Sequence, residues 1–123
     1  MSFFSAINCM DGRVQSPVNS YLKERFRVDY VDVITEPGPD KILSEQTDAV
    51  TIESIQRRLD ISLQKHHSKG IAIIGHADCA GNPVSENTHH THIRDAMKWL
   101  GRQYPDTLIV GLWVDKNWQV NAL

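Results

Sequence analysis

The sequence has 123 residues, of which 41% are hydrophobic and 23% are charged, and its formal net charge is −2. This length suits one domain, residues 1–123, with a core large enough to need no disulfide bonds. The composition excludes a disordered or collagen-like chain, and a slightly acidic sequence without a lysine or arginine run gives no support for nucleic-acid binding.

The sequence also lacks the features of a membrane or secreted protein. No stretch approaches the roughly 20 apolar residues of a membrane span, so we expect no membrane partner. The opening residues, MSFFSAINC, have neither the charged region nor the long apolar region of a signal peptide. We therefore expect a cytoplasmic protein, in which the two cysteines are thiols or metal ligands rather than a disulfide.

The first third of the sequence predicts a strand, a helix and a second strand. A short buried strand is expected over Ser2–Asn8. A helix follows over Ser16–Phe26, with Ser16 as its N-cap and Pro17 in its first position. Residues Val28–Thr35 alternate between apolar and polar side chains, which predicts a strand.

The middle of the sequence predicts a loop, a long helix and a buried strand. Glu36–Lys41 has two prolines around a glycine, so we expect no regular structure there. Thr47–His67 has apolar residues at helical spacing and Gly70 just after it, which indicates an amphipathic helix. Ile71–Gly75 is entirely apolar, as expected for a strand covered on both faces.

The last part of the sequence predicts a third main helix over Thr91–Gln103, a buried strand over Thr107–Val114 and a short final strand over Trp118–Val120. Strands and helices therefore alternate along the chain. This order predicts an α/β fold with a mainly parallel central sheet of about four to five strands, flanked by helices.

Polar residues stand where two of the predicted strands end. Cys9 follows the first strand, and His76 follows Ile71–Gly75, with Cys79 three residues later. Reactive groups in parallel α/β sheets lie just beyond the carboxyl ends of the strands. We therefore expect these three side chains at one edge of the sheet, although 67 positions separate Cys9 from His76.

Two thiolates and an imidazole are ligands that suit Zn²⁺. Three protein ligands leave the fourth tetrahedral position open, which is typical of a catalytic rather than a structural zinc site. A histidine or a carboxylate elsewhere in the chain could instead close the site.

Asp11 and Arg13 come two and four residues after Cys9. A carboxylate there could bind the metal, or accept a hydrogen bond from metal-bound water. Arg13 could hold Asp11 in a bidentate pair, which would keep the carboxylate ionised and fix its direction. Asp78, inside the turn between His76 and Cys79, is expected only to cap nearby backbone N–H groups.

Three histidines follow the second motif within Asn87–Ile93. His90 and His92 are candidates for a proton shuttle, because histidine titrates near neutral pH. The simpler interpretation is a solvated helix start that Asn87 or Thr88 caps.

The two motifs, CMDGR at Cys9–Arg13 and HADC at His76–Cys79, resemble those of the β-class carbonic anhydrases. The resemblance implies that Cys9, His76 and Cys79 bind Zn²⁺ and that Asp11 and Arg13 form the catalytic dyad. It also implies hydration of CO₂ to bicarbonate by zinc-bound hydroxide, and assembly into homodimers or larger homo-oligomers.

The sequence also departs from that family, and we identify it as a minimal, divergent member. Cys9 stands near its start, so the family's long N-terminal helical arm is expected to be absent. TEPGPDK at Thr35–Lys41 replaces a loop that shapes the substrate pocket. Two alternatives follow: a hydrolase of carbonyl sulfide or carbon disulfide, and a non-catalytic zinc protein whose site Asp11 closes.

Overall fold

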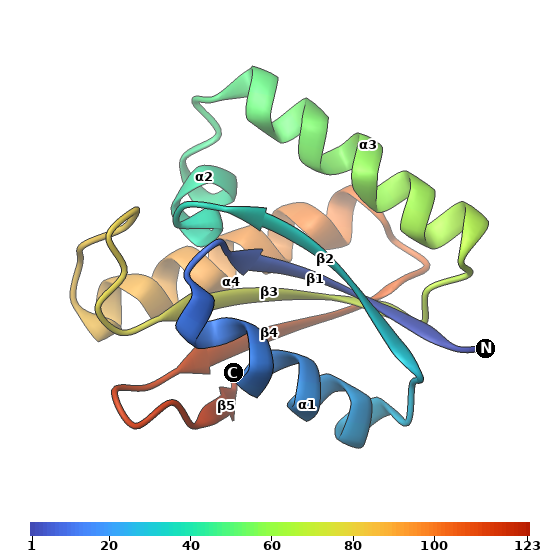
Figure 1. Ribbon diagram of the computed structural model, residues 1–123. Helices are drawn as coiled ribbons and strands as arrows, with labels where there is room; N and C mark the ends of the chain where they lie inside the picture. The colour runs from blue at the N-terminus through green and yellow to red at the C-terminus, as the bar shows by residue number, and fades with distance from the viewer.

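A computed structural model describes residues 1–123 and shows a five-stranded sheet in the order β2-β1-β3-β4-β5 (Figure 1). Neighbouring strands are parallel except for β5, which runs antiparallel to β4. The structure confirms the predicted α/β class and the mainly parallel sheet. The strands are β1 (Phe3–Cys9), β2 (Tyr30–Glu36), β3 (Gly70–His76), β4 (Leu108–Val114) and β5 (Val120–Ala122).

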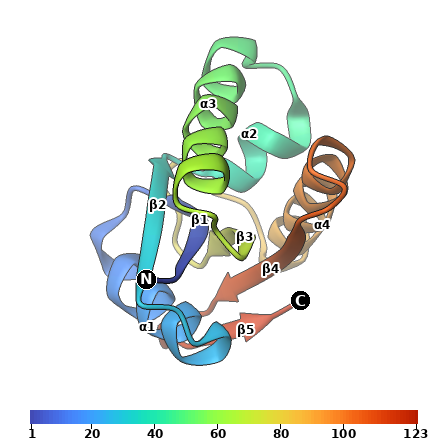
Figure 2. The same ribbon diagram turned by 90° about the vertical axis from the view of Figure 1, so that its right-hand side faces the viewer.

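Helices cover both faces of the sheet, as Figures 1 and 2 show. One face carries α1 alone, and the other carries the remaining three helices. A short 3₁₀ helix, η1, leads into α1. The helical segments are η1 (Gly12–Val14), α1 (Gln15–Phe26), α2 (Pro39–Glu45), α3 (Ala49–Lys65) and α4 (Glu86–Gln103).

Strand β3 shows how the sheet separates two apolar cores. All seven of its residues are buried. Ala72 and Ile74 pack in the core on the α1 side, whereas Ile71 and Ile73 pack in the core beneath α2, α3 and α4. Successive side chains of a strand point to opposite faces, so a fully apolar strand is what a two-sided sheet requires.

The segment Glu36–Lys41 was expected to lack regular structure, and that prediction was wrong in its second half. Pro39 is the first residue of α2, a position where its fixed φ and missing N–H are tolerated. Gly38 precedes it with φ +61°, a left-handed conformation that favours glycine. The proline–glycine–proline sequence therefore marks a tight entry into a helix rather than an open loop.

Helix starts also differ from the predictions. Helix α1 begins at Gln15, and Ser16 does not cap it, because η1 already supplies the preceding turn. Helix α4 begins at Glu86 rather than Thr91, and its N-cap is Ser85, whose hydroxyl accepts a hydrogen bond from Thr88 N–H. Helix α3 lies within the predicted Thr47–His67, with Asp48 as its N-cap, but it ends at Lys65, and Gly70 is instead the first residue of β3. The final strand lies two residues later than Trp118–Val120.

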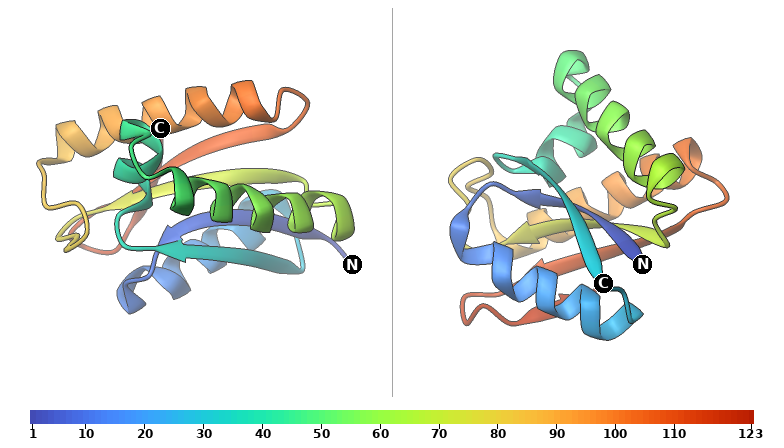
Figure 3. Two further views of the ribbon diagram at one scale, coloured as in Figure 1. Left: turned by 90° about the horizontal axis from the view of Figure 1, so that it is seen from above. Right: turned by 45° about the vertical axis from the view of Figure 1, so that its right-hand side comes forward.

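The carboxyl ends of β1 and β3 lie at the same end of the sheet, opposite the N-terminus of the chain (Figure 3). Cys9 is the last residue of β1, and His76 is the last residue of β3. Parallel pairing of these neighbouring strands therefore brings the two motifs to one edge, as predicted. No helix in the structure has both the length and the hydrophobicity that crossing a membrane requires.

Candidate metal centre

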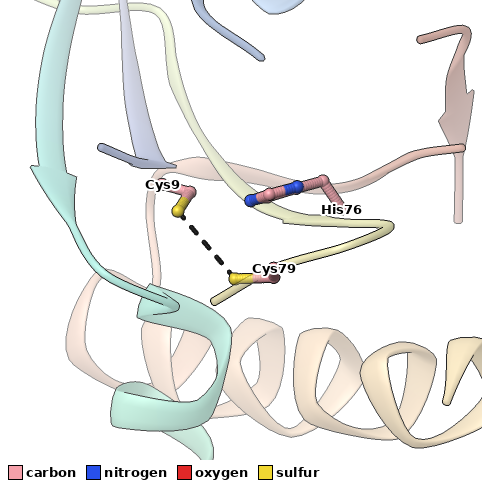
Figure 4. A group of neighbouring side chains, drawn as sticks. All are labelled: Cys9, His76 and Cys79. Atoms are coloured by element: carbon pink, nitrogen blue, oxygen red, sulfur yellow. Dashed lines mark hydrogen bonds between the residues drawn. The ribbon is translucent and has the colours of Figure 1, made fainter. Parts of the chain in front are cut away.

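Three potential metal ligands converge at this edge of the sheet. The Sγ atoms of Cys9 and Cys79 and a ring nitrogen of His76 all lie within 4.8 Å of one another, and all three residues are buried (Figure 4). The two sulfur atoms are 3.9 Å apart. The residues that sequence reasoning grouped as ligands are thus brought together by the fold.

The His76 ring is set up to offer one nitrogen to an ion. Its Nδ1 lies 2.8 Å from the carbonyl oxygen of Ala77, and an N–H at that position donates to it. The other nitrogen, Nε2, is buried and has no hydrogen-bond partner. A metal-binding histidine is typically held this way, with its second nitrogen fixed by a carbonyl or carboxylate. The unpartnered Nε2 and the two thiols together fit Zn²⁺.

The hydrogen bond between the two thiols shifts their pKa values in opposite directions. Hydrogen bonding from Cys79 lowers the pKa of Cys9 more than burial raises it, and His76 and the backbone N–H groups of Gly38 and Asp11 lower it further. The same hydrogen bond and burial raise the pKa of Cys79. One thiolate therefore forms readily without a metal, and a bound cation would replace the proton of the other thiol and stabilise the second thiolate.

Asp11 and Arg13 form the bidentate pair that their spacing suggested. Arg13 donates from Nη2 to Asp11 Oδ2 at 2.7 Å and from Nε to Oδ1 at 3.1 Å. The Arg13 backbone N–H donates to Asp11 Oδ1 at 2.9 Å. These hydrogen bonds lower the pKa of Asp11 to about 2, so the carboxylate is ionised at neutral pH.

Sequence reasoning missed how Arg13 itself is held. Its Nη1 donates to the Asp78 carboxylate at 3.1 Å, and its Nη2 donates to the Asp78 carbonyl oxygen at 3.1 Å. The guanidinium also lies 4.8 Å from the ring centre of Trp118. Asp78 was expected to cap local backbone N–H groups; instead its carboxylate accepts from Arg13, and its backbone adopts φ +57°. Contacts between distant segments of this kind leave no pattern in the sequence.

An open cleft of about 430 Å³ borders Cys79 and Arg13 and gives this edge of the sheet contact with solvent. Its lining residues are Arg13, Asp78, Cys79, Ala80, Pro83 and Val84. A larger hollow of about 610 Å³ lies along α3 and contains no histidine or cysteine. Of these two hollows, only the smaller one is lined by a residue of the potential metal site.

The candidate shuttle histidines lie in the first half of α4. His90 Nε2 lies 3.3 Å from a Glu86 carboxylate oxygen, and its ring meets Trp113 edge-on. His92 Nδ1 lies 3.0 Å from the Asn82 side-chain nitrogen, which connects it to the turn that carries Cys79. Neither histidine forms a hydrogen bond with the three potential ligands, and the shuttle role stays a prediction.

Comparison with known proteins agrees with this geometry. A family model described as "putative carbonic anhydrase" matches residues 1–123. Among solved structures, the chain is similar to a tetrameric β-carbonic anhydrase from the filamentous ascomycete Sordaria macrospora, with a TM-score of 0.55 and 15% sequence identity. The match covers 98% of this chain and 79% of that one. A search of curated proteins finds no match.

The low identity to the solved structure shows a shared fold and nothing further, whereas the family match spans the whole sequence. The chain therefore belongs to the carbonic anhydrase family that this model describes, and its fold is that of the β-class.

Proposed function

We propose that the protein is a zinc-dependent carbonic anhydrase, a lyase that interconverts CO₂ and bicarbonate. The observation that carries the proposal is the convergence of Cys9, His76 and Cys79 within 4.8 Å of one another, at the carboxyl ends of neighbouring strands. Family membership supports it independently.

The three residues would hold Zn²⁺ through two thiolates and the Nε2 atom of His76. Zinc in such a site supplies a Lewis acid that makes hydroxide available as a nucleophile near neutral pH. The Ala77 carbonyl fixes the tautomer of His76 and so keeps Nε2 available. The three ligands are buried, and the cleft beside Cys79 gives the site access to solvent.

Asp11 would orient the nucleophile. Its carboxylate is ionised and can accept a hydrogen bond from the attacking water, which directs an oxygen lone pair toward CO₂. Arg13 holds that carboxylate in one orientation, and Asp78 and Trp118 hold Arg13 in turn. His90 and His92 remain candidates to pass the released proton to solvent.

The direction of Asp11 favours an open fourth position over a closed, non-catalytic site. Both carboxylate oxygens accept hydrogen bonds from Arg13, and Asp11 is not among the donors that lie within 4.8 Å of one another. Closure by Asp11 requires loss of these hydrogen bonds.

We also propose a cytoplasmic location, which suits reduced thiols. We propose homo-oligomeric assembly as well, because the similar solved enzyme is tetrameric.

The test is stopped-flow CO₂ hydration by zinc-loaded protein between about pH 6 and 9, the range in which zinc-dependent hydration operates. Asp11→Asn keeps the size of the side chain and removes the carboxylate, so it should lower turnover by about 10²-fold or more. Sulfide release from carbonyl sulfide and carbon disulfide is measured on the same sample. If hydration is no faster than in buffer but sulfide is released, carbonyl sulfide or carbon disulfide replaces CO₂ as the substrate. If neither activity is detected, the protein is a zinc-binding protein without catalysis.

A further inference from the structure

A largely buried polar cluster lies next to the candidate metal centre, and only its His92 has a part in the proposed function. It consists of Asp40 at the start of α2, Asn82 in the turn after Cys79, and His89 and His92 in α4. These residues come from three separate segments. The cluster therefore fastens together the loop before α2, the turn that carries Cys79, and the first turns of α4.

The centre of the cluster is a carboxylate–histidine pair. His89 Nδ1 lies 2.6 Å from Asp40 Oδ2, and each side chain is 1% exposed. At this distance the Nδ1 hydrogen of His89 donates to Asp40. The same nitrogen cannot then accept from Asn82, whose amide at 3.0 Å donates to His92 Nδ1 instead.

The cluster is a poor source of stability. The second carboxylate oxygen of Asp40 and the side-chain oxygen of Asn82 are buried without partners. An unpaired buried acceptor destabilises the folded state, and apolar residues often replace buried ion pairs without loss. A function in placing neighbouring groups explains this arrangement better than stability does.

The groups that it places are those around the thiols. Gly38 and Gly81 pack backbone to backbone, and a Cβ atom on Gly38 would lie 2.8 Å from the Gly81 carbonyl carbon. Beside the hydrogen bond from Cys79, Gly38 N–H lowers the pKa of Cys9, and Asn82 N–H donates to the Cys79 carbonyl oxygen at 3.3 Å. Asp40 stands two residues after Gly38, and Asn82 directly follows Gly81.

Asp40 also packs against the residue before His76, the third proposed ligand. A Cβ atom on Gly75 would lie 2.8 Å from Asp40 Oδ2, so the carboxylate rests against the residue that precedes His76. The cluster thus contacts three segments: the Gly38 loop next to Cys9, the turn that carries Cys79, and the end of β3 that carries His76.

We propose that Asp40 and His89 are positioning residues that hold the Gly38 loop against the Cys79 turn and so set the affinity and geometry of the metal centre. This inference rests on the zinc site of the proposed function. Loss of the pair would let the two turns separate and would alter the arrangement of the segments around the thiols.

The experiment measures Zn²⁺ affinity, by competition with a chromophoric chelator, and the thiolate-to-Co²⁺ charge-transfer absorption of the cobalt-substituted protein. The variants are Asp40→Asn and His89→Gln. The chain offers a matched control in Asp32→Asn, because Asp32 Oδ2 also lies 2.6 Å from a histidine nitrogen, that of His66, in a more exposed pair. Leu100→Val controls for loosened packing in α4, about 16 Å along the helix from His89.

We expect Asp40→Asn and His89→Gln each to weaken Zn²⁺ binding about 10- to 100-fold and to shift the charge-transfer band. The double variant should lose little more than the worse single variant, because both substitutions break one pair. Asp32→Asn and Leu100→Val should leave both readouts near those of the wild type.

Equal Zn²⁺ affinity and an identical cobalt spectrum in Asp40→Asn and Asp32→Asn would overturn the positioning role while leaving the zinc site intact. A wild type that binds neither metal would overturn the zinc site and this inference together. If Asp40→Asn does not fold, His89→Gln decides on the same two readouts, and parallel losses in Leu100→Val would contradict a specific role.

Discussion

The contact between the Gly38 and Gly81 turns can be tested by adding one methyl group. A Cβ atom at Gly81 would lie 2.5 Å from the Pro37 carbonyl carbon and 2.7 Å from the Gly38 nitrogen. Both are backbone atoms, so neither can rotate away. Carbon atoms reach favourable contact only near 3.5 Å, so Gly81→Ala must push the turns apart by roughly 1 Å.

Overpacking of this kind costs about 1 to 3 kcal/mol of folding free energy. We therefore expect Gly81→Ala to lower the free energy of unfolding by that amount and to weaken Zn²⁺ binding. Urea unfolding of the metal-free protein gives the first quantity, and chelator competition gives the second.

Gly101→Ala is the matched control, because Gly101 lies in α4 and nothing stands within 4 Å of its added Cβ atom. Alanine suits a helix better than glycine, so this variant should be more stable by about 0.5 to 1 kcal/mol. If Gly81→Ala keeps the stability and the Zn²⁺ affinity of the wild type, the contact between the two turns does not align the proposed metal ligands.

Three further predictions concern the residues of the site. Pairing with Arg13 lowers the pKa of Asp11 from its ordinary value of about 3.9 to about 2 in the folded protein, so the pairing stabilises the fold above about pH 3.9 and this stabilisation is lost as the pH falls toward 2. Asp11→Asn should therefore reduce the loss of unfolding free energy over this acid range, measured by pH-dependent unfolding. An unchanged pH dependence would contradict the pairing. In metal-free protein, peroxide should convert the thiols of Cys9 and Cys79, whose sulfurs are 3.9 Å apart, into one disulfide and two waters. Mass spectrometry should show the loss of two hydrogens, and bound zinc should prevent it; equal oxidation with zinc would count against these ligands. If His92 passes protons, His92→Ala should slow hydration in dilute buffer and regain rate with added imidazole, whereas an unchanged rate would exclude the role.

Two apolar runs were sufficient to predict where the three potential metal ligands lie. Cys9 and His76 each follow an apolar run, and parallel strands present their carboxyl ends at one edge, so the convergence required no knowledge of contacts. The Asp11–Arg13 pair was predictable for a similar reason, because both residues lie within one short turn.

Features that depend on distant segments could not be predicted this way. Asp40 and His89 are 49 positions apart, and neither belongs to a local motif. The same holds for Arg13 and Asp78, which meet only once β1 and β3 are paired. Helix α2 was missed for a local reason, since a proline that disrupts a helix interior also suits its first position.

The most direct test of the metal centre is the zinc content of purified wild-type protein and of Cys79→Ser, combined with zinc X-ray absorption. We predict about one zinc ion per wild-type chain, with two sulfur ligands at about 2.3 Å, and loss of most zinc in Cys79→Ser. Wild-type protein that retains no zinc, or zinc retained equally by Cys79→Ser, would contradict the assignment of Cys9, His76 and Cys79 as its ligands.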